Sequence, residues 1–141
     1  MLEIIRNLKG HHEPQEEGVF YEILQRVPQD GTMIEVGSFW AYYSLWFSHG
    51  MPERKNYLIE PVLWKAALGR LNFALNNKPV NVDQYYVNDD KLDLDKSTGA
   101  ELEALAGVEP ICMDDYVRIK GIDHVDILHA DIQGAELALL R

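Results

Sequence analysis

Short apolar runs alternate with amphipathic stretches from residue 33 to the end of the chain. Met33–Val36 is a compact run that stops at a glycine, as a buried parallel strand does. Further strands are predicted over 56–60, 80–87 and 125–131, and 110–120 is predicted to hold a strand or a short helix. This alternation predicts a doubly wound α/β fold with a mostly parallel sheet.

Apolar residues at helical spacing predict the helices of this fold. The first helix follows a polar tract and begins near Pro14, and others are expected over 42–49, 64–75 and 100–106 and from 134 to 140. The whole chain, 1–141, is interpreted as one domain with a helical lead-in over 1–30. Two stripes are expected to face the sheet: Val19, Phe20, Ile23, Leu24 and Val27, and then Trp64, Ala67, Leu68, Leu71 and Leu75.

The charge of the chain narrows the classes of partner. Its formal net charge is −10, and an acidic surface repels phosphate backbones and anionic lipids, so neither nucleic acid nor a membrane is expected as a partner. Cys112 is the single cysteine, which excludes an intrachain disulfide. The first residues do not resemble a signal peptide, and no apolar run is long enough to span a membrane, so a cytoplasmic location is expected.

Candidate ligand-binding residues follow the first two predicted strands. In an open parallel sheet a ligand binds beyond the carboxyl ends of the strands. Gly37 allows close backbone approach there, and Glu35 is expected to meet an ammonium group through water. Glu60 ends the second strand, where an acid accepts hydrogen bonds from ribose hydroxyls. An ordinary turn and a solvated carboxylate are the alternatives.

The dinucleotide fingerprint G-x-G-x-x-G is absent from this turn. Phe39 and Tyr42 stand where its later glycines would be, so a pyrophosphate would approach the backbone with difficulty. The turn therefore favours a nucleoside that lacks phosphates.

Three blocks resemble the signature blocks of FkbM-type methyltransferases, in the same order and with similar separation. They are IEVGSFWAYYSL (34–45), LIEP (58–61) and VDILHADIQGAE (125–136). The resemblance covers roughly 33–141. It implies a class I methyltransferase, Rossmann-like fold that binds S-adenosylmethionine and methylates a hydroxyl group, often on a sugar or a secondary metabolite.

The resemblance also implies roles for individual residues. The methionine end of the cofactor would be lined by Glu35, Gly37 and Ser38, with Phe39 beside them. Glu60 would hold the ribose. The adenine would lie near Asn88 and Asp89. Asp131 would face the methyl-transfer region, with Glu136 close by. The chain departs from the family pattern at Phe39 and Ala41, where Asn and Gly are usual, and at His129 and Gln133, where Lys and Glu are usual.

Methyl transfer depends mainly on alignment, and a hydroxyl acceptor benefits from a base. Asp131 and His129 are the predicted catalytic residues, because residues two apart on a strand share one face. A core-facing histidine is the alternative for His129. A metal site built from His124, His129 and Asp131 is not predicted, since 124 and 129 would point to opposite faces.

A complete class I methyltransferase has seven strands, and this sequence ends after the fourth. The sheet is therefore expected to be incomplete at its C-terminal side, with an exposed strand edge that a second copy covers in a homodimer. The expected substrate is a small molecule that carries a hydroxyl group. A nucleoside-binding module without turnover, or an inactive fragment, remains an alternative to the enzyme.

Overall fold

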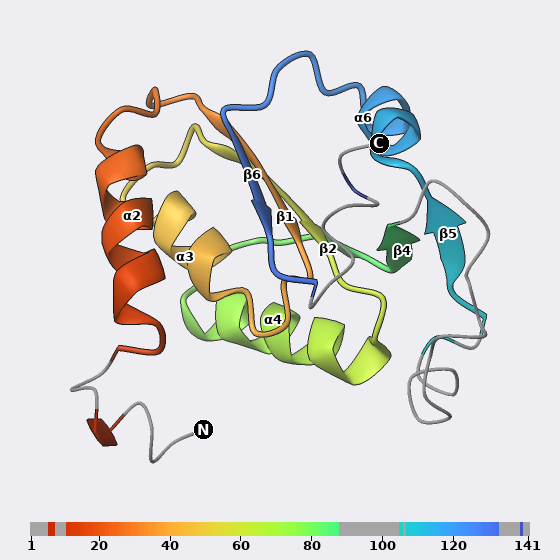
Figure 1. Cartoon of the computed structure of the whole chain (residues 1–141), viewed down its shortest axis with the longest axis horizontal. Helices are drawn as coiled ribbons and strands as arrows, with labels where there is room; N and C mark the ends of the chain where they lie inside the picture. Colours follow the sequence, from red (N-terminus) through yellow and green to blue (C-terminus); the bar gives the residue numbers. More distant parts are fainter. Residues whose placement is uncertain (1–5, 8–10, 88–104, 106, 133–138, 140–141) are drawn as a thin grey trace.

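The computed structural model describes residues 6–7, 11–87, 105, 107–132 and 139 (Figure 1). Within these residues, the main sheet has four parallel strands in the order β3-β2-β1-β6. Their bounds are Thr32–Val36 for β1, Lys55–Ile59 for β2, Val82–Asp83 for β3 and Ile127–Ala130 for β6. The predicted doubly wound α/β fold is confirmed. The chain moves outward from β1 to β3 and then returns to the other side of β1, so the strand order reverses between β1 and β6.

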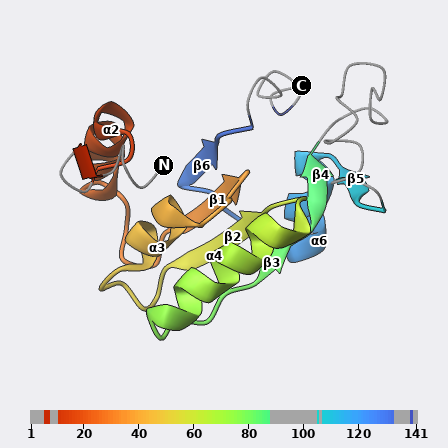
Figure 2. The same ribbon diagram turned by 90° about the horizontal axis from the view of Figure 1, so that it is seen from below.

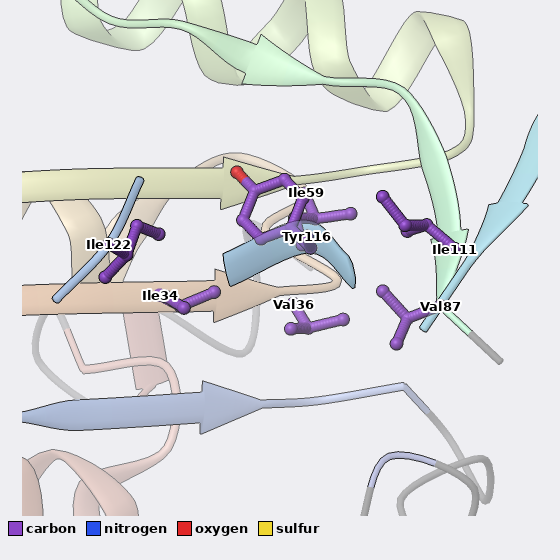
Figure 3. Packing of buried hydrophobic residues seen from close by; sticks show 7 residues of the cluster. All are labelled: Ile34, Val36, Ile59, Val87, Ile111, Tyr116 and Ile122. Atoms are coloured by element: carbon purple, nitrogen blue, oxygen red, sulfur yellow. The ribbon is translucent and has the colours of Figure 1, made fainter. Parts of the chain in front are cut away.

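In the described part of the chain, four helices cover the two faces of this sheet (Figure 1). They are α2 (Pro14–Leu24), α3 (Tyr42–Ser48), α4 (Leu63–Leu75) and α6 (Met113–Lys120). On one face α2 and α3 pack against Met33, and α4 packs against Leu58. On the other face Tyr116 of α6 is completely buried and packs in one cluster with Ile34 of β1 and Ile59 of β2 (Figure 3). Alternation of side chains along β1 and β2 supplies both layers with apolar residues.

The predicted strand 80–87 is two strands in two different sheets. β3 pairs with β2 and ends at Asp83, whereas β4 (Tyr85–Val87) pairs in parallel with β5 (Glu109–Ile111). Asp83 is anchored by two side chains of α6, because its carboxylate accepts hydrogen bonds from the Tyr116 hydroxyl and the Lys120 ammonium, both at 2.8 Å. The chain leaves the main sheet directly after this anchor. The stretch 110–120 contains both the end of a strand and a helix.

The predicted apolar stripe of α4 was wrong. Its buried positions are Ala66, Gly69 and Phe73, whereas Trp64 and Leu71 are more than half exposed. Figure 2 shows α4 lying along β2 and β3, where only small side chains allow the helix to come this close to the turn after β1. A Cβ atom on Gly69 would lie 3.0 Å from the Phe39 carbonyl oxygen. Close packing at this glycine therefore sets the rotation of the helix.

The stripe of α2 was also only partly correct. Phe20 is buried, but Val19 and Ile23 are exposed, and the other buried residue of this helix is Glu17. Glu17 accepts hydrogen bonds from the backbone amides of His12 and Glu13 and thus caps its own helix.

Several predictions concern residues outside those described: the helix over 100–106 except for residue 105, and the helix over 134–140 except for residue 139. In the described part of the sheet β6 is an edge strand, and the homodimer that would cover it remains a prediction. None of the described helices is both long enough and apolar enough to cross a membrane.

Candidate functional site

The turn that joins β1 to α3 lies at the carboxyl end of the sheet, beside the point where the strand order reverses. Three of its five residues have left-handed backbone angles: Gly37 (φ 77°), Phe39 (φ 41°) and Ala41 (φ 62°). The amides of Gly37 and Ser38 both donate to the carbonyl oxygen of Ile59, at 2.9 and 3.2 Å. The turn therefore folds over the end of β2, although Phe39 and Ala41 are residue types that pay an energetic penalty in this conformation.

Gly37 is the residue at which this turn meets the segment that follows β6. A Cβ atom at position 37 would overlap the carbonyl oxygen of Asp131 and would lie 3.0 Å from the Ile132 side chain. The Asp131 amide in turn donates to the carbonyl oxygen of Val36 at 3.2 Å. The predicted need for a glycine is explained here by close approach of the protein's own backbone.

Glu60 lies at the end of β2 and joins that strand to the turn. Its two carboxylate oxygens accept hydrogen bonds from the backbone amides of Phe39, at 3.0 Å, and of Val62, at 2.9 Å. The residue is 3% exposed, and burial raises the pKa of its carboxyl group. The interpretation of Glu60 as an ordinary solvated carboxylate is wrong, because the side chain is buried and holds the turn.

Glu35 lies on the neighbouring strand and is also 3% exposed. One carboxylate oxygen accepts a hydrogen bond from the Ser44 amide in the first turn of α3, at 3.2 Å. Burial raises the pKa of Glu35 to about 8, against the lowering effect of the bonds from Ser44. Glu35 and Glu60 thus lie on adjacent strands at the same end of the sheet, as predicted, and each is bonded to backbone amides next to the turn.

His129 sits beside Glu35, since the two residues are register partners on β6 and β1. Its Nε2 lies 2.7 Å from a carboxylate oxygen of Glu16 in the first turn of α2, and its Nδ1 lies 3.8 Å from Glu35. The ring also packs against Tyr43, with 4.4 Å between ring centroids. The side chain is 14% exposed, so the alternative of a core-facing histidine describes its surroundings better than an open catalytic position does.

The remaining predicted site residues have different surroundings, and three of them lie outside the described residues. Asp131 is exposed at the end of β6. Asn88, Asp89 and Glu136 lie outside the described residues, so their predicted roles remain predictions. Ser38 is almost completely buried, and its hydroxyl has no hydrogen-bond partner among the described residues.

The structure adds Glu16 to the site, a residue that the sequence had not indicated, and it shows the aromatic contacts of the turn. Glu16 is 113 positions from His129, and its sequence signal was only that of an acid in a first helical turn. Trp40 packs edge-on against His12, with ring centroids 5.1 Å apart, and Phe39 packs against Trp64 at 5.7 Å. Aromatic side chains therefore pack against the two aromatic residues of the turn.

Two hollows lie outside the predicted nucleoside site. One, of about 260 Å³, is at the amino end of the sheet and is lined in part by Asp30, Lys55 and His124. The other, of about 510 Å³, follows the first turn of α2 from His12 to Glu16. Among the described residues no group of three His, Cys, Asp or Glu side chains is arranged to hold a metal ion. His124 bonds to Asp126 and does not approach His129.

Comparisons with known proteins give little independent information about this site. No protein-family model matches the chain, and no curated protein matches it. Among solved structures, this chain is similar to that of M. capricolum TrmK, which was solved in complex with the natural cofactor product S-adenosyl-homocysteine. The sequence identity is 13% and the TM-score is 0.39. The match covers 77% of this chain and 47% of TrmK, so the chain spans about half the length of that protein.

Proposed function

We propose that this chain is the cofactor-binding part of an S-adenosylmethionine-dependent methyltransferase of the FkbM type. The observation that carries the proposal is the hydrogen bond from the Phe39 amide to Glu60, 3.0 Å long, which joins the acid ending β2 to the glycine turn ending β1. This pairing lies at the carboxyl end of a parallel sheet, next to the reversal of strand order, where such folds bind nucleotides. The acceptor proposed from the sequence is a hydroxyl group on a sugar or secondary metabolite.

The chemistry of the turn supports a nucleoside without phosphates as the ligand. A buried acid repels a pyrophosphate, and the Phe39 side chain occupies a position that the dinucleotide fingerprint reserves for glycine. Each oxygen of the Glu60 carboxylate accepts one backbone hydrogen bond and retains a second lone pair for a ribose hydroxyl. The unpaired Ser38 hydroxyl offers a further polar group in the same turn.

These residues fit the cofactor in kind, and each has a distinct proposed task. Gly37, Ser38 and Phe39 would hold the methionine end and Glu60 the ribose. Glu35 would act through Ser44 and α3, because its two carboxyl oxygens face the Ser44 amide and His129. The bound cofactor supplies an activated methyl group, so the protein is left to align the acceptor. Asp131, exposed beside the turn, is the proposed acceptor of the hydroxyl proton.

A nucleoside-binding module without turnover is a second candidate. The specific observation in its favour is the environment of His129, since Nε2 is hydrogen-bonded to Glu16 and Nδ1 faces Glu35. Nε2 is bonded to Glu16 and Nδ1 is buried beside Glu35, so neither nitrogen is accessible to an acceptor hydroxyl, and any catalytic base must be found elsewhere.

Calorimetry with S-adenosylhomocysteine tests the proposal. We expect saturable binding to the unmodified chain and at least about tenfold weaker binding to Glu60→Gln, equivalent to about 1.4 kcal/mol. Glu53→Gln, an exposed acid before β2, is the matched control and should bind as the unmodified chain does. Absence of binding to the correctly folded chain would reject the proposal. Binding without methyl transfer to any hydroxylated acceptor would favour the module.

A further inference from the structure

Three polar side chains from three separate elements lie in a row, and this polar chain has one hydrogen bond, between His129 and Glu16. Glu16 belongs to α2, His129 to β6 and Glu35 to β1. His129 Nε2 is 2.7 Å from Glu16, and Nδ1 is 3.8 Å from the Oε1 atom of Glu35. The Glu35 side chain is 4% exposed and that of His129 14%, so water screens this pair weakly, whereas the Glu16 side chain at the end of the row is 42% exposed.

The hydrogen-bond partners of the chain determine where protons must be. The Glu16 carboxylate accepts a hydrogen bond, so Nε2 of His129 carries a hydrogen and donates it. Among the described residues Nδ1 has no hydrogen-bond partner although it is buried, and it faces Oε1 of Glu35 at 3.8 Å. The other oxygen of Glu35 already accepts from the Ser44 amide. If neither Glu35 nor Nδ1 held a proton, a carboxylate oxygen would face an imidazole lone pair in a buried site.

We propose that Glu35 and His129 share one proton that completes this chain, and that the chain docks the first turn of α2 onto the carboxyl end of the sheet. Loss of the proton leaves two acceptors facing each other and weakens the docking of α2. The position of this turn therefore depends on pH. The inference does not require that the chain bind a cofactor.

The surroundings of the pair favour retention of the proton. Acidic side chains act on it from two elements, since both Glu16 on α2 and Glu60 after β2 raise the pKa of Glu35. The ring of Tyr43 on α3 covers His129. Other charged and titratable groups surround the first turn of α2. Glu17 lies in the helix, and His11, His12 and Glu13 directly precede it. The charge of Asp131, after β6, acts to raise the pKa of Glu13.

The direction of the pH dependence follows from the two glutamates. Burial raises the pKa of Glu35 to about 8, above its ordinary value of 4.5, so its contribution to docking is complete below pH 4.5 and is lost as the pH rises through 8. Burial also acts to raise the pKa of Glu16, but hydrogen bonds from His129 and Glu13 outweigh it and lower the pKa. Glu16 therefore stays charged as the acceptor, and its contribution is lost only in acid, below pH 4.5.

Glu35→Gln is the decisive variant, because glutamine reproduces the protonated form and does not titrate. Its amide group can donate to Nδ1 of His129 while its carbonyl oxygen accepts from the Ser44 amide. Glu22→Gln is the matched control, since Glu22 is an exposed residue of the same helix. The measurement is hydrogen exchange at the α2 amides of residues 18–24 between pH 6 and pH 8, corrected for the intrinsic pH dependence of exchange.

In the unmodified chain and in Glu22→Gln, we expect the protection of these amides to fall at least tenfold from pH 6 to pH 8. If one proton is released each time α2 opens, the protection can change by at most about tenfold per pH unit. In Glu35→Gln the protection should be constant. Constant protection in the unmodified chain, or an unchanged fall in Glu35→Gln, would overturn the proposal.

A second measurement needs no variant. ¹⁵N chemical shifts of the His129 imidazole at pH 7 report which ring nitrogens carry hydrogen. We expect a hydrogen on Nε2, either in the neutral tautomer or in the imidazolium form. A neutral ring with its only hydrogen on Nδ1 would contradict the proton arrangement and overturn the proposal even if Glu35→Gln does not fold.

Discussion

Replacement of Gly37 by alanine tests whether the turn after β1 is locked against the segment after β6. The new Cβ atom would overlap the carbonyl oxygen of Asp131 and lie 3.0 Å from the Ile132 side chain. Gly37 also has a φ of 77°, a conformation that costs a residue with a Cβ atom about 1–2 kcal/mol. The lower entropy of the unfolded chain returns about 0.4–1 kcal/mol of this cost.

Gly50→Ala separates the two contributions. Gly50 has nearly the same backbone angle, φ 70°, but a Cβ atom there would meet nothing within 4 Å. Its substitution should lower the free energy of unfolding by about 1 kcal/mol, from the backbone conformation alone. Gly37→Ala should lose a further ~1–3 kcal/mol, the usual cost of overpacking, because backbone must move to relieve the contact.

Urea unfolding monitored by tryptophan fluorescence and circular dichroism measures both losses on one scale. Both variants should unfold with the slope of the unmodified chain, so that midpoints compare directly. Equal losses for the two variants would refute the close approach of Asp131 to Gly37, whatever the absolute values.

Two further predictions concern buried hydrogen-bonding groups, and both use the same urea assay. Glu60→Ala should lower the free energy of unfolding by ~2–4 kcal/mol, because it leaves the Phe39 and Val62 amides without acceptors. Glu60→Gln keeps one acceptor oxygen, so its free energy of unfolding should fall by about half as much. A Glu60→Ala variant as stable as Glu60→Gln would contradict this role. Arg54→Lys should lose ~1–2 kcal/mol of unfolding free energy. The guanidinium group donates to the carbonyl oxygens of Phe47 in α3, at 2.9 Å, and of Val27 in the loop after α2, at 3.3 Å, and an ammonium group cannot reach both. No change in the unfolding midpoint of Arg54→Lys would show that these bonds contribute nothing.

The fold was predictable where the sequence pattern is local. The buried strand 33–36 and the strand ending before Glu60 follow from apolar runs with clear stops, and their alternation with helices implies parallel pairing. The same reasoning placed Glu35, Gly37 and Glu60 at one end of the sheet, because the carboxyl ends of parallel strands lie together.

What could not be predicted depends on contacts between distant parts of the chain. The rotation of α4 is set by Gly69 packing on the Phe39 carbonyl group, which outweighs the pattern of larger apolar residues on that helix. The end of β3 depends on Asp83 meeting two side chains of α6.

The same limit applies to the candidate site. The environment of His129 depends on Glu16, which is 113 residues away, and the sequence alone gives no sign of that contact. The departures at Phe39 and Ala41 were visible in the sequence. That both positions adopt left-handed backbone became evident only from the structure.

The central proposal is that the turn after β1 and the acid ending β2 together bind an adenosine without phosphates. The most direct measurement is a titration of ¹⁵N-labelled protein with S-adenosylhomocysteine, followed amide by amide. The account predicts saturable shifts concentrated at 37–41 and 60–62. Shifts confined to the polar hollow at the amino end of the sheet, or none at millimolar ligand, would contradict it.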